Sequence, residues 1–250
     1  MEYAPFKFFT KNAQGRDFIV GDIHGMFSSL IELLGKVDFN EKIDRVFSVG
    51  DLIDRGAESY RAIEFLNKPW FFSIMGNHES MLIDSADNEK MYNSWVDRCG
   101  GDWWTNIPDL LQPRIRKKLA QLPIAIELET NYGNIGIVHA DIPMHMAWPY
   151  FVQELQEAED MKNYSLWSRN RYKRILSDAY VPDVAGIDLV VVGHTPVAKP
   201  LQEGNVYFID TGATYIEDES LAYLTLLEVG DTLQVHQIST YQRELVGMHL

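Results

Sequence analysis

Five short apolar segments of this chain each end at a residue that can bind a metal ion. Four of them run into glycine followed by an acidic, amide or imidazole side chain, and the fifth runs directly into histidine. The residues at these ends are Asp22, Asp51, Asn77, His139 and His194. Segments of this length, rich in β-branched and aromatic residues, are typical of buried strands. The glycines mark places where the backbone turns sharply or approaches a ligand closely.

Helical patterns separate the first three of these expected strands. Ser29 begins an amphipathic run with Glu32 three residues later, which is the spacing of a capping box, so a helix is expected to start at Ser28 and Ser29. A second helical pattern covers 57–67. Strand, turn, helix and strand in this order indicate βαβ units. Further strand patterns follow later in the chain, at 123–129, 205–209, 221–229 and 233–238.

The sequence predicts a single α/β domain over residues 1–250, with helical excursions near 89–122 and 153–181. It contains no repeat, low-complexity stretch or linker that would mark a domain boundary. The first excursion is rich in tryptophan between Trp95 and Trp104. These rings either line a substrate groove or pack the excursion onto the body of the domain, and packing is the interpretation that we favour.

The charge balance and the apolar runs restrict the partners that we expect. The 22 Lys and Arg against 36 Asp and Glu give a formal net charge of −14. We expect no nucleic-acid partner, because phosphate backbones are bound by clusters of basic side chains. No apolar run approaches the ~18 residues of a membrane helix, and the N-terminus lacks a signal-peptide pattern. A single cysteine, Cys99, excludes an intramolecular disulfide scaffold. The prediction is a cytoplasmic protein without membrane contact.

The strand-end residues together suggest a metal centre. Sites in open α/β sheets form beyond the carboxyl ends of the strands, and His24, two residues after Asp22, can face the same side as that carboxylate. Mixed carboxylate, imidazole and amide ligands favour Mn, Fe or Zn. Six such ligands are too many for one catalytic ion, but they suit two ions ~3.5–4 Å apart, the arrangement that serves phosphate-ester hydrolysis. The remaining histidines lack this context and are interpreted as structural or surface residues: His145, His236 and His249.

Five motifs in order resemble the signature of the PPP-type serine/threonine phosphatases, a branch of the metallophosphoesterase superfamily. The motifs are GDIHG at 21–25, GDLIDRG at 50–56, GNHE at 76–79, VHAD at 138–141 and GHTP at 193–196. The chain is most similar to the bacterial and bacteriophage lambda members, through the sequence PWF at 69–71, the His-Ala-Asp sequence and the sequence WSRNR at 167–171.

This resemblance implies a fold and a division of ligands. The fold is an αββα sandwich of two mixed β-sheets flanked by helices. By the family pattern, Asp22, His24 and Asp51 hold the first metal. Asp51 bridges to the second, which Asn77, His139 and His194 complete. Both ions are usually manganese in the bacterial and phage members.

The resemblance also implies roles in hydrolysis of phosphoserine and phosphothreonine in phosphoproteins or phosphopeptides. The two ions lower the pKa of a shared water. Arg55 clamps the phosphoryl oxygens, and a second clamp comes from Arg169, with Arg171 as the competing assignment. His78 resembles the general acid for the leaving alkoxide, and Asp54 would orient it and favour its protonated form. Because this chain lacks the long tails of the eukaryotic members, we expect no obligatory regulatory subunit.

Three other functions stay open. A symmetrical dinucleoside tetraphosphate hydrolase shares the same metal ligands, although that group tends to have a small residue at position 54 and Asp at position 79, where this chain has Asp54 and Glu79. A non-catalytic scaffold of the same fold is disfavoured because every expected ligand and His78 are present. Hydrolysis of small phosphate esters is expected as a side activity of an open two-metal site.

Overall fold

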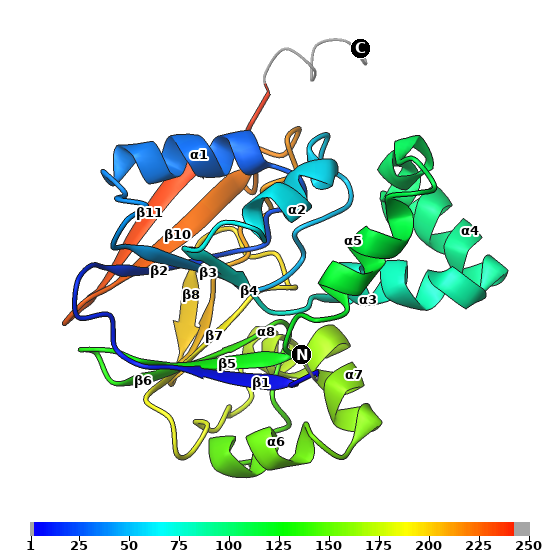
Figure 1. Ribbon diagram of the computed structural model, residues 1–250. Coiled ribbons are helices and arrows are strands. Elements are labelled where there is room, and N and C mark those ends of the chain that lie inside the picture. The colour runs from blue at the N-terminus through cyan, green and yellow to red at the C-terminus, as the bar shows by residue number, and fades with distance from the viewer. Residues whose placement is uncertain (1–2, 243–250) are drawn as a thin grey trace.

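A computed structural model describes residues 3–242 and contains two mixed β-sheets packed face to face between helices (Figure 1). One sheet has six strands in the order β1 (Phe6–Phe9), β5 (Ala125–Glu129), β6 (Asn134–Val138), β7 (Leu189–Val192), β9 (Val206–Phe208) and β8 (Leu201–Glu203). The other has five strands in the order β11 (Leu233–Ser239), β10 (Tyr223–Val229), β2 (Asp17–Val20), β3 (Arg45–Ser48) and β4 (Phe71–Ser73). The predicted αββα sandwich is confirmed. His249 lies outside the described residues.

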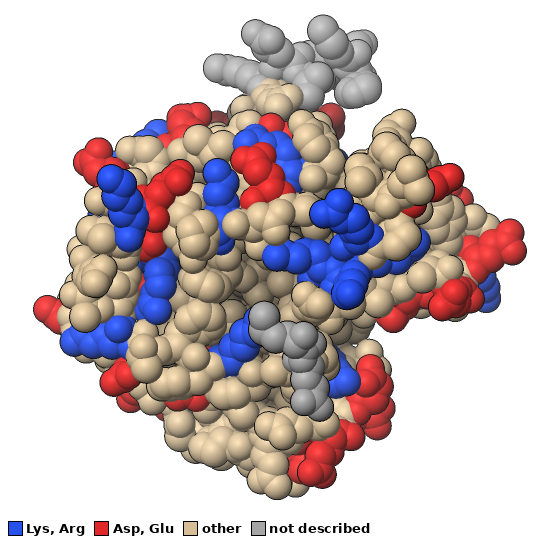
Figure 2. Space-filling view, viewed as in Figure 1, with Lys and Arg blue, Asp and Glu red and all other residues tan. Residues whose placement is uncertain are grey.

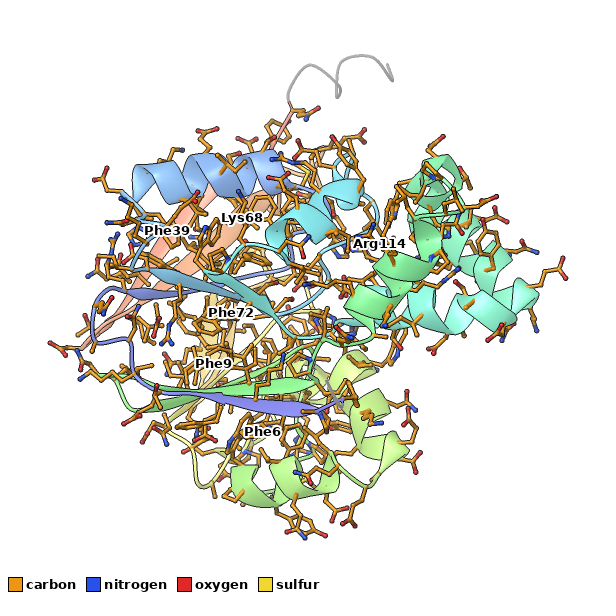
Figure 3. The ribbon with its side chains drawn as sticks, in the orientation of Figure 1. Phe6, Phe9, Phe39, Lys68, Phe72 and Arg114 are labelled. Atoms are coloured by element: carbon orange, nitrogen blue, oxygen red, sulfur yellow. The ribbon has the colours of Figure 1, made fainter. Side chains whose placement is uncertain are left out.

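The space between the sheets is filled by fully buried apolar side chains from both of them, among them Ile19, Phe47, Ile137 and Val191. Neighbouring residues of the same strands, such as Phe18 beside Ile19, belong to a second apolar cluster. The inner strands are therefore buried on both faces, which is why they are continuous apolar runs in the sequence. At one end of the sandwich, the rings of Phe9 on β1 and Phe72 on β4 lie 4.8 Å apart and join the sheets (Figure 3).

Helix α1 (Phe27–Lys36) covers the five-stranded sheet. After β3, the chain forms a 3₁₀ turn at Ser59–Arg61 and the short helix α2 (Ala62–Phe65). The expected capping box at the start of α1 is wrong. The carboxylate of Glu58, from a distant loop, accepts hydrogen bonds from the backbone N and the hydroxyl of Ser28, and Glu32 pairs with Lys36 instead. The helix begins before Ser29, and the tertiary contact from Glu58 satisfies the free N–H of Ser28 in its first turn.

The remaining helices are gathered in two groups (Figure 1). The first group projects from one side of the sandwich and consists of α3 (Asn77–Asp84), α4 (Glu89–Arg98) and α5 (Gln112–Leu119), with 3₁₀ turns at Ser85–Asp87 and Gly101–Asn106. The second lies against the six-stranded sheet and consists of α6 (Trp148–Glu154), α7 (Glu159–Trp167) and α8 (Asn170–Leu176). Of these helices, α4, α5, α7 and α8 fall within the ranges 89–122 and 153–181, whereas α3 precedes the first range and α6 begins before the second.

Two strands, β1 and β8, have no counterpart among the strands expected from the sequence. β1 contains three phenylalanines and Lys7, and Phe8 on it is 52% exposed. β8 has only three residues and pairs with β9 alone. Both are edge strands, which form by pairing with a sheet that already exists rather than from a strong local pattern.

The face drawn in Figure 2 carries Lys and Arg at its centre, over α5 and the opening between β1 and β4, with acidic groups around the rim. A cavity of about 410 Å³ opens there, and Lys7, Lys68 and Lys118 line it with Phe9 and other residues. Although the formal net charge is −14, the fold brings these basic side chains together locally, which the total charge did not predict. Within residues 3–242, no helix is long and apolar enough to cross a membrane.

Candidate active site

The five strand-end residues meet at one edge of the two sheets. Asp22, Asp51 and Asn77 follow β2, β3 and β4 of the five-stranded sheet, whereas His139 and His194 follow β6 and β7 of the other. The amide oxygen Oδ1 of Asn77 lies 2.8 Å from His139 Nε2 and 2.9 Å from His194 Nδ1. The backbone N–H of His194 donates to Asp22 Oδ2 at 3.0 Å. The predicted convergence of these side chains is therefore present in the structure.

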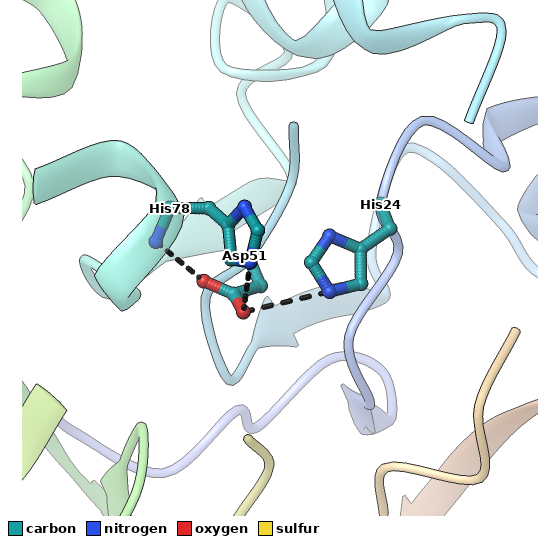
Figure 4. A group of neighbouring side chains, drawn as sticks. All are labelled: His24, Asp51 and His78. Carbon is teal, nitrogen blue, oxygen red and sulfur yellow. Dashed lines mark hydrogen bonds and ion pairs between the residues drawn. The ribbon is translucent and has the colours of Figure 1, made fainter. Parts of the chain in front are cut away.

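Asp51 stands at the centre of the site (Figure 4). Its Oδ2 lies 3.5 Å from His24 Nε2, 3.4 Å from His139 Nε2 and 4.0 Å from His78 Nε2. Two groups of potential ligands share this carboxylate, one with His24 and His78 and the other with His139 and His194. Such sharing is what a carboxylate that bridges two ions requires. On distance alone, His78 also falls within the first group.

The orientation of two of the imidazoles is fixed by the backbone. His24 Nδ1 lies 2.8 Å from the carbonyl oxygen of Ile53, and His139 Nδ1 lies 2.8 Å from that of Val49. Because a carbonyl can only accept, Nδ1 carries the proton in both rings, and Nε2 is the ring nitrogen that faces the cluster. Metal-binding histidines are commonly held in this way by their second nitrogen.

The donor set fits two divalent ions. It combines carboxylate, imidazole and amide donors, as Mn, Fe or Zn sites do, and its side chains are all buried. The Oδ1 atom of Asp22 is buried without a hydrogen-bond partner among the described residues. An uncompensated buried carboxylate oxygen is costly, so a cation at this point would stabilise it.

Burial and mutual charge set the protonation of the cluster. Burial acts to raise the pKa of Asp51, but His139 and His78 outweigh it and hold that pKa well below the usual value. Burial, together with the nearby Asp210 and Asp51, raises the pKa of Asp22 well above its usual range. Burial and His139 lower the pKa of His194 to about 3. A histidine that stays neutral offers a lone pair, as metal binding requires.

The backbone of the site is strained. Five of its non-glycine residues have positive φ angles: His24 at 44°, Asp51 at 48°, Asp54 at 74°, Arg55 at 67° and His194 at 66°. Left-handed backbone costs about 1–3 kcal/mol at such residues and persists only where the surrounding structure enforces it. Its concentration here indicates that side-chain placement at this edge of the sheets outweighs local backbone preference.

His78, Asp54 and Arg55 lie together beside the cluster. His78 Nδ1 is 2.7 Å from Asp54 Oδ2, and both side chains are buried. The guanidinium of the exposed Arg55 reaches between two imidazoles, with Nη1 3.1 Å from His24 Nε2 and Nη2 3.1 Å from His78 Nε2. The ring nitrogen of His78 that is not paired with Asp54 therefore faces the cluster.

The structure adds a role for Glu79 beyond the one that sequence reasoning used. Its carboxylate accepts hydrogen bonds from the backbone N–H groups of Asp51, Leu52 and Gly76, at 2.8–3.0 Å. Burial, with the charge of Asp51 acting in the same direction, raises the pKa of Glu79 to about 7. Glu79 thus ties the loop that carries Asp51 to the start of α3. Its position three residues after Gly76, typical of an N-terminal helix cap, is the sequence signal for this.

The two candidate arginines of the second phosphate clamp have different surroundings. Arg171 is 2% exposed, and it donates to Asp141 Oδ1 at 2.8 Å and to the carbonyl oxygens of Ile142 and Pro182. Arg169 is exposed, and its Nη2 donates to the carbonyl oxygen of His194 at 3.3 Å. The geometry favours Arg169 at the site and gives Arg171 a structural role.

Replacing these arginines should separate stability from activity. Arg171→Met leaves Asp141 as an uncompensated buried charge, and we expect the free energy of unfolding to fall by about 3–5 kcal/mol. Arg169→Met, its matched control at an exposed position, should change that free energy by less than about 0.5 kcal/mol but weaken substrate binding. Urea unfolding of both variants measures the difference. Equal stability of the two would contradict the structural role of Arg171.

Comparison with known proteins assigns the family. Residues 18–212 match the model of the calcineurin-like phosphoesterases, and the chain belongs to this family of metallophosphoesterases. It is 34% identical over 203 residues to serine/threonine-protein phosphatase 1 of Salmonella typhimurium, covering 79% of this chain and 87% of that protein. It is likewise 34% identical over 199 residues to serine/threonine-protein phosphatase 2 of Escherichia coli, covering 78% of this chain and 87% of that protein.

Two more distant similarities complete the comparison. A symmetrical bis(5'-nucleosyl)-tetraphosphatase of Shewanella frigidimarina is 30% identical over 168 residues, covering 66% of this chain and 58% of that protein. A protein serine/threonine phosphatase from Saccharomyces cerevisiae superposes with a TM-score of 0.66 at 12% identity, covering 96% of this chain and 85% of that one. The second similarity establishes the fold alone.

Proposed function

We propose that this metallophosphoesterase is a phosphoprotein phosphatase that hydrolyses phosphoserine and phosphothreonine monoesters with two divalent ions, most often Mn²⁺. The observation that carries the proposal is the buried pair of His78 and Asp54 beside the candidate metal cluster. The names of the relatives at 34% identity agree with it. Small phosphate esters are expected as secondary substrates, and the chain is expected to work without a regulatory subunit.

The proposed ligands divide around Asp51. Asp22, His24 and Asp51 would hold one ion, and Asp51, Asn77, His139 and His194 the other. When bound, the ions would offset the negative charge of the phosphate and lower the pKa of a water that attacks phosphorus. The protein supplies the fixed orientation of the imidazoles, through the carbonyl groups of Ile53 and Val49.

Two arginines would hold the phosphoryl oxygens. The guanidinium of Arg55 is exposed and adjoins the cluster, and its planar fork of donors matches a phosphate group. Arg169 lies between α7 and α8, and its guanidinium contacts the loop that carries His194. Donors from two sides would restrain rotation of the phosphate and align it for attack.

Once Arg55 turns from His78 Nε2 to the phosphate and this nitrogen is protonated, His78 would donate that proton to the departing serine or threonine oxygen. Asp54 holds the opposite nitrogen at 2.7 Å and so directs Nε2 toward the cluster. An alkoxide is a very poor leaving group, and a positioned general acid contributes about 10²–10⁴-fold to such a reaction. The presence of this pair therefore agrees with a monoester of an aliphatic alcohol as the substrate.

Hydrolysis of symmetrical dinucleoside tetraphosphates is the second candidate, and the relative at 30% identity favours it. Cleavage of that substrate releases ADP, whose terminal phosphate leaves as a stable anion and needs no proton. A general acid held by a buried carboxylate would have little use there. The pair of His78 and Asp54 thus distinguishes the two candidates on chemical grounds.

A direct comparison of substrates tests the proposal. The purified chain, stripped of metal and reloaded with Mn²⁺, should release phosphate from a phosphoserine peptide at least about tenfold faster than it cleaves diadenosine tetraphosphate. Faster production of ADP from the dinucleotide would assign the second candidate. Inactivity on both substrates would contradict the proposal and revive the interpretation as a non-catalytic scaffold. A reaction without added metal is the control.

A further inference from the structure

The Asp54 carboxylate receives hydrogen bonds from the first helical excursion as well as from His78. Trp95 of α4 donates its indole Nε1–H to Oδ2 at 2.6 Å, and Trp103 donates to Oδ1 at 2.7 Å. His78 Nδ1 shares Oδ2 at 2.7 Å. Asp54 is fully buried, so these three contacts, with both oxygens used, fix the rotation of its carboxylate. Hydrogen bonds to an ionised acceptor are about twice as strong as neutral ones.

The same excursion holds the backbone that carries Asp54. The carbonyl oxygen of Gly100 accepts from Arg55 N at 3.1 Å, and Asp54 and Arg55 form two consecutive left-handed residues. Gly100 itself has φ +83°, and a Cβ added there would clash with the Arg55 backbone. The segment between the two tryptophans therefore lies directly against the strained turn and opposes its relaxation.

We propose that Trp95 and Trp103 are positioning residues for hydrolysis: their indole N–H groups hold Asp54, and through it His78, in the orientation for proton donation. This inference rests on the proposed function, because it assigns a purpose to the orientation of His78. The excursion is then part of the catalytic apparatus and does more than pack against the sandwich.

Trp104 provides a matched control within the same excursion. It is fully buried, as Trp95 is, and its ring lies 6.1 Å from that of Trp95 and 5.5 Å from that of Trp103. Its Nε1, however, has no hydrogen-bond partner among the described residues. Replacing each tryptophan with phenylalanine removes an indole ring from one aromatic cluster, but only two of the three changes remove a hydrogen bond to Asp54.

The experiment compares Trp95→Phe, Trp103→Phe and Trp104→Phe in the full chain loaded with Mn²⁺. We expect kcat on a phosphoserine peptide to fall about 10–100-fold in the first two variants, by analogy with the loss of hydrogen-bond partners that orient metal ligands. On p-nitrophenyl phosphate, whose leaving group needs no proton, kcat should fall less than about threefold. Trp104→Phe should stay within about threefold of the unmodified protein on both substrates.

A second measurement needs no turnover. In the ¹⁵N spectrum of the metal-free protein, the indole N–H signals of Trp95 and Trp103 should appear downfield of that of Trp104. In an Asp54→Ala variant they should move upfield while the Trp104 signal stays in place. If the signals do not differ in this way, the hydrogen bonds from the two indoles to Asp54 are absent and the inference is overturned.

The outcomes separate the inference from the proposed function. Two results would overturn the inference: equal kcat losses on both substrates, or losses in Trp104→Phe as large as in the other two variants. Either would show that the tryptophans act only through packing, and the proposed phosphatase function would stand. An unmodified protein that cleaves the dinucleotide instead of the phosphopeptide would overturn the proposed function, and the positioning role with it. A selective loss on the phosphopeptide in Trp95→Phe and Trp103→Phe supports both.

Discussion

Replacing Asp51 with asparagine is expected to lower turnover about a thousandfold or more and to reduce the bound manganese below two equivalents. Asp51 Oδ2 lies within 4.0 Å of ring nitrogens of His24, His78 and His139, so its charge serves both halves of the site. A bound metal contributes several kcal/mol of transition-state stabilisation, and each 1.36 kcal/mol is tenfold in rate. Metal analysis after desalting, together with phosphate release, measures both effects.

The matched control is Asp87→Asn, which removes one carboxylate from an exposed position. It should bind two equivalents of manganese and turn over at the rate of the unmodified protein. Asparagine is nearly isosteric with aspartate, so unfolding of the Asp51 variant is not expected, and circular dichroism checks this. Two tightly bound ions and ordinary turnover in Asp51→Asn would refute the central place given to this carboxylate.

The second large effect is expected for His78→Asn. Turnover of a phosphoserine peptide should fall by about 10²–10⁴-fold, the contribution of a positioned general acid. Turnover of p-nitrophenyl phosphate should fall by less than about tenfold, because nitrophenolate leaves without a proton. The ratio of the two rates is therefore the diagnostic quantity, and it is independent of how much active protein each preparation contains.

Metal content distinguishes this role of His78 from ligation. The ring also falls within ligand distance of His24 and Asp51. If His78 acts only as the acid, His78→Asn should retain both ions. Loss of an ion, with equal rate losses on the two substrates, would show that His78 is a ligand and would remove the argument for an alcohol leaving group.

Most of the strands follow from local sequence patterns, whereas their arrangement as a sandwich was implied by the family resemblance. The inner strands of both sheets are buried on both faces, so they appear in the sequence as continuous apolar runs, as at Leu189–Val192. The edge strands β1 and β8 were missed because such strands depend on a partner. The start of α1 was misassigned because Glu58, thirty residues away, satisfies its free N–H in place of a local cap.

The candidate ligands were also readable from the chain, whereas their supporting contacts were not. Each candidate ligand lies at or shortly after the end of a strand, and strand ends of a sheet meet at one edge. Trp95 and Trp103, in contrast, lie 41 and 49 residues from Asp54. No periodicity or spacing links an indole to a carboxylate over such a distance. The choice between Arg169 and Arg171 likewise required the burial of each side chain.

The sequence alone determined the α/β class and the residue types that gather beyond the strands. Strand burial and the side chains at strand ends depend on short segments of the chain, so they can be predicted locally. Only the tertiary structure decided which nitrogen of each imidazole faces the cluster, which arginine is buried and which indoles hold Asp54. Those features depend on hydrogen bonds between segments that are distant along the chain. Such bonds form only after the sheets have packed and the excursion has docked against the loop of Asp54.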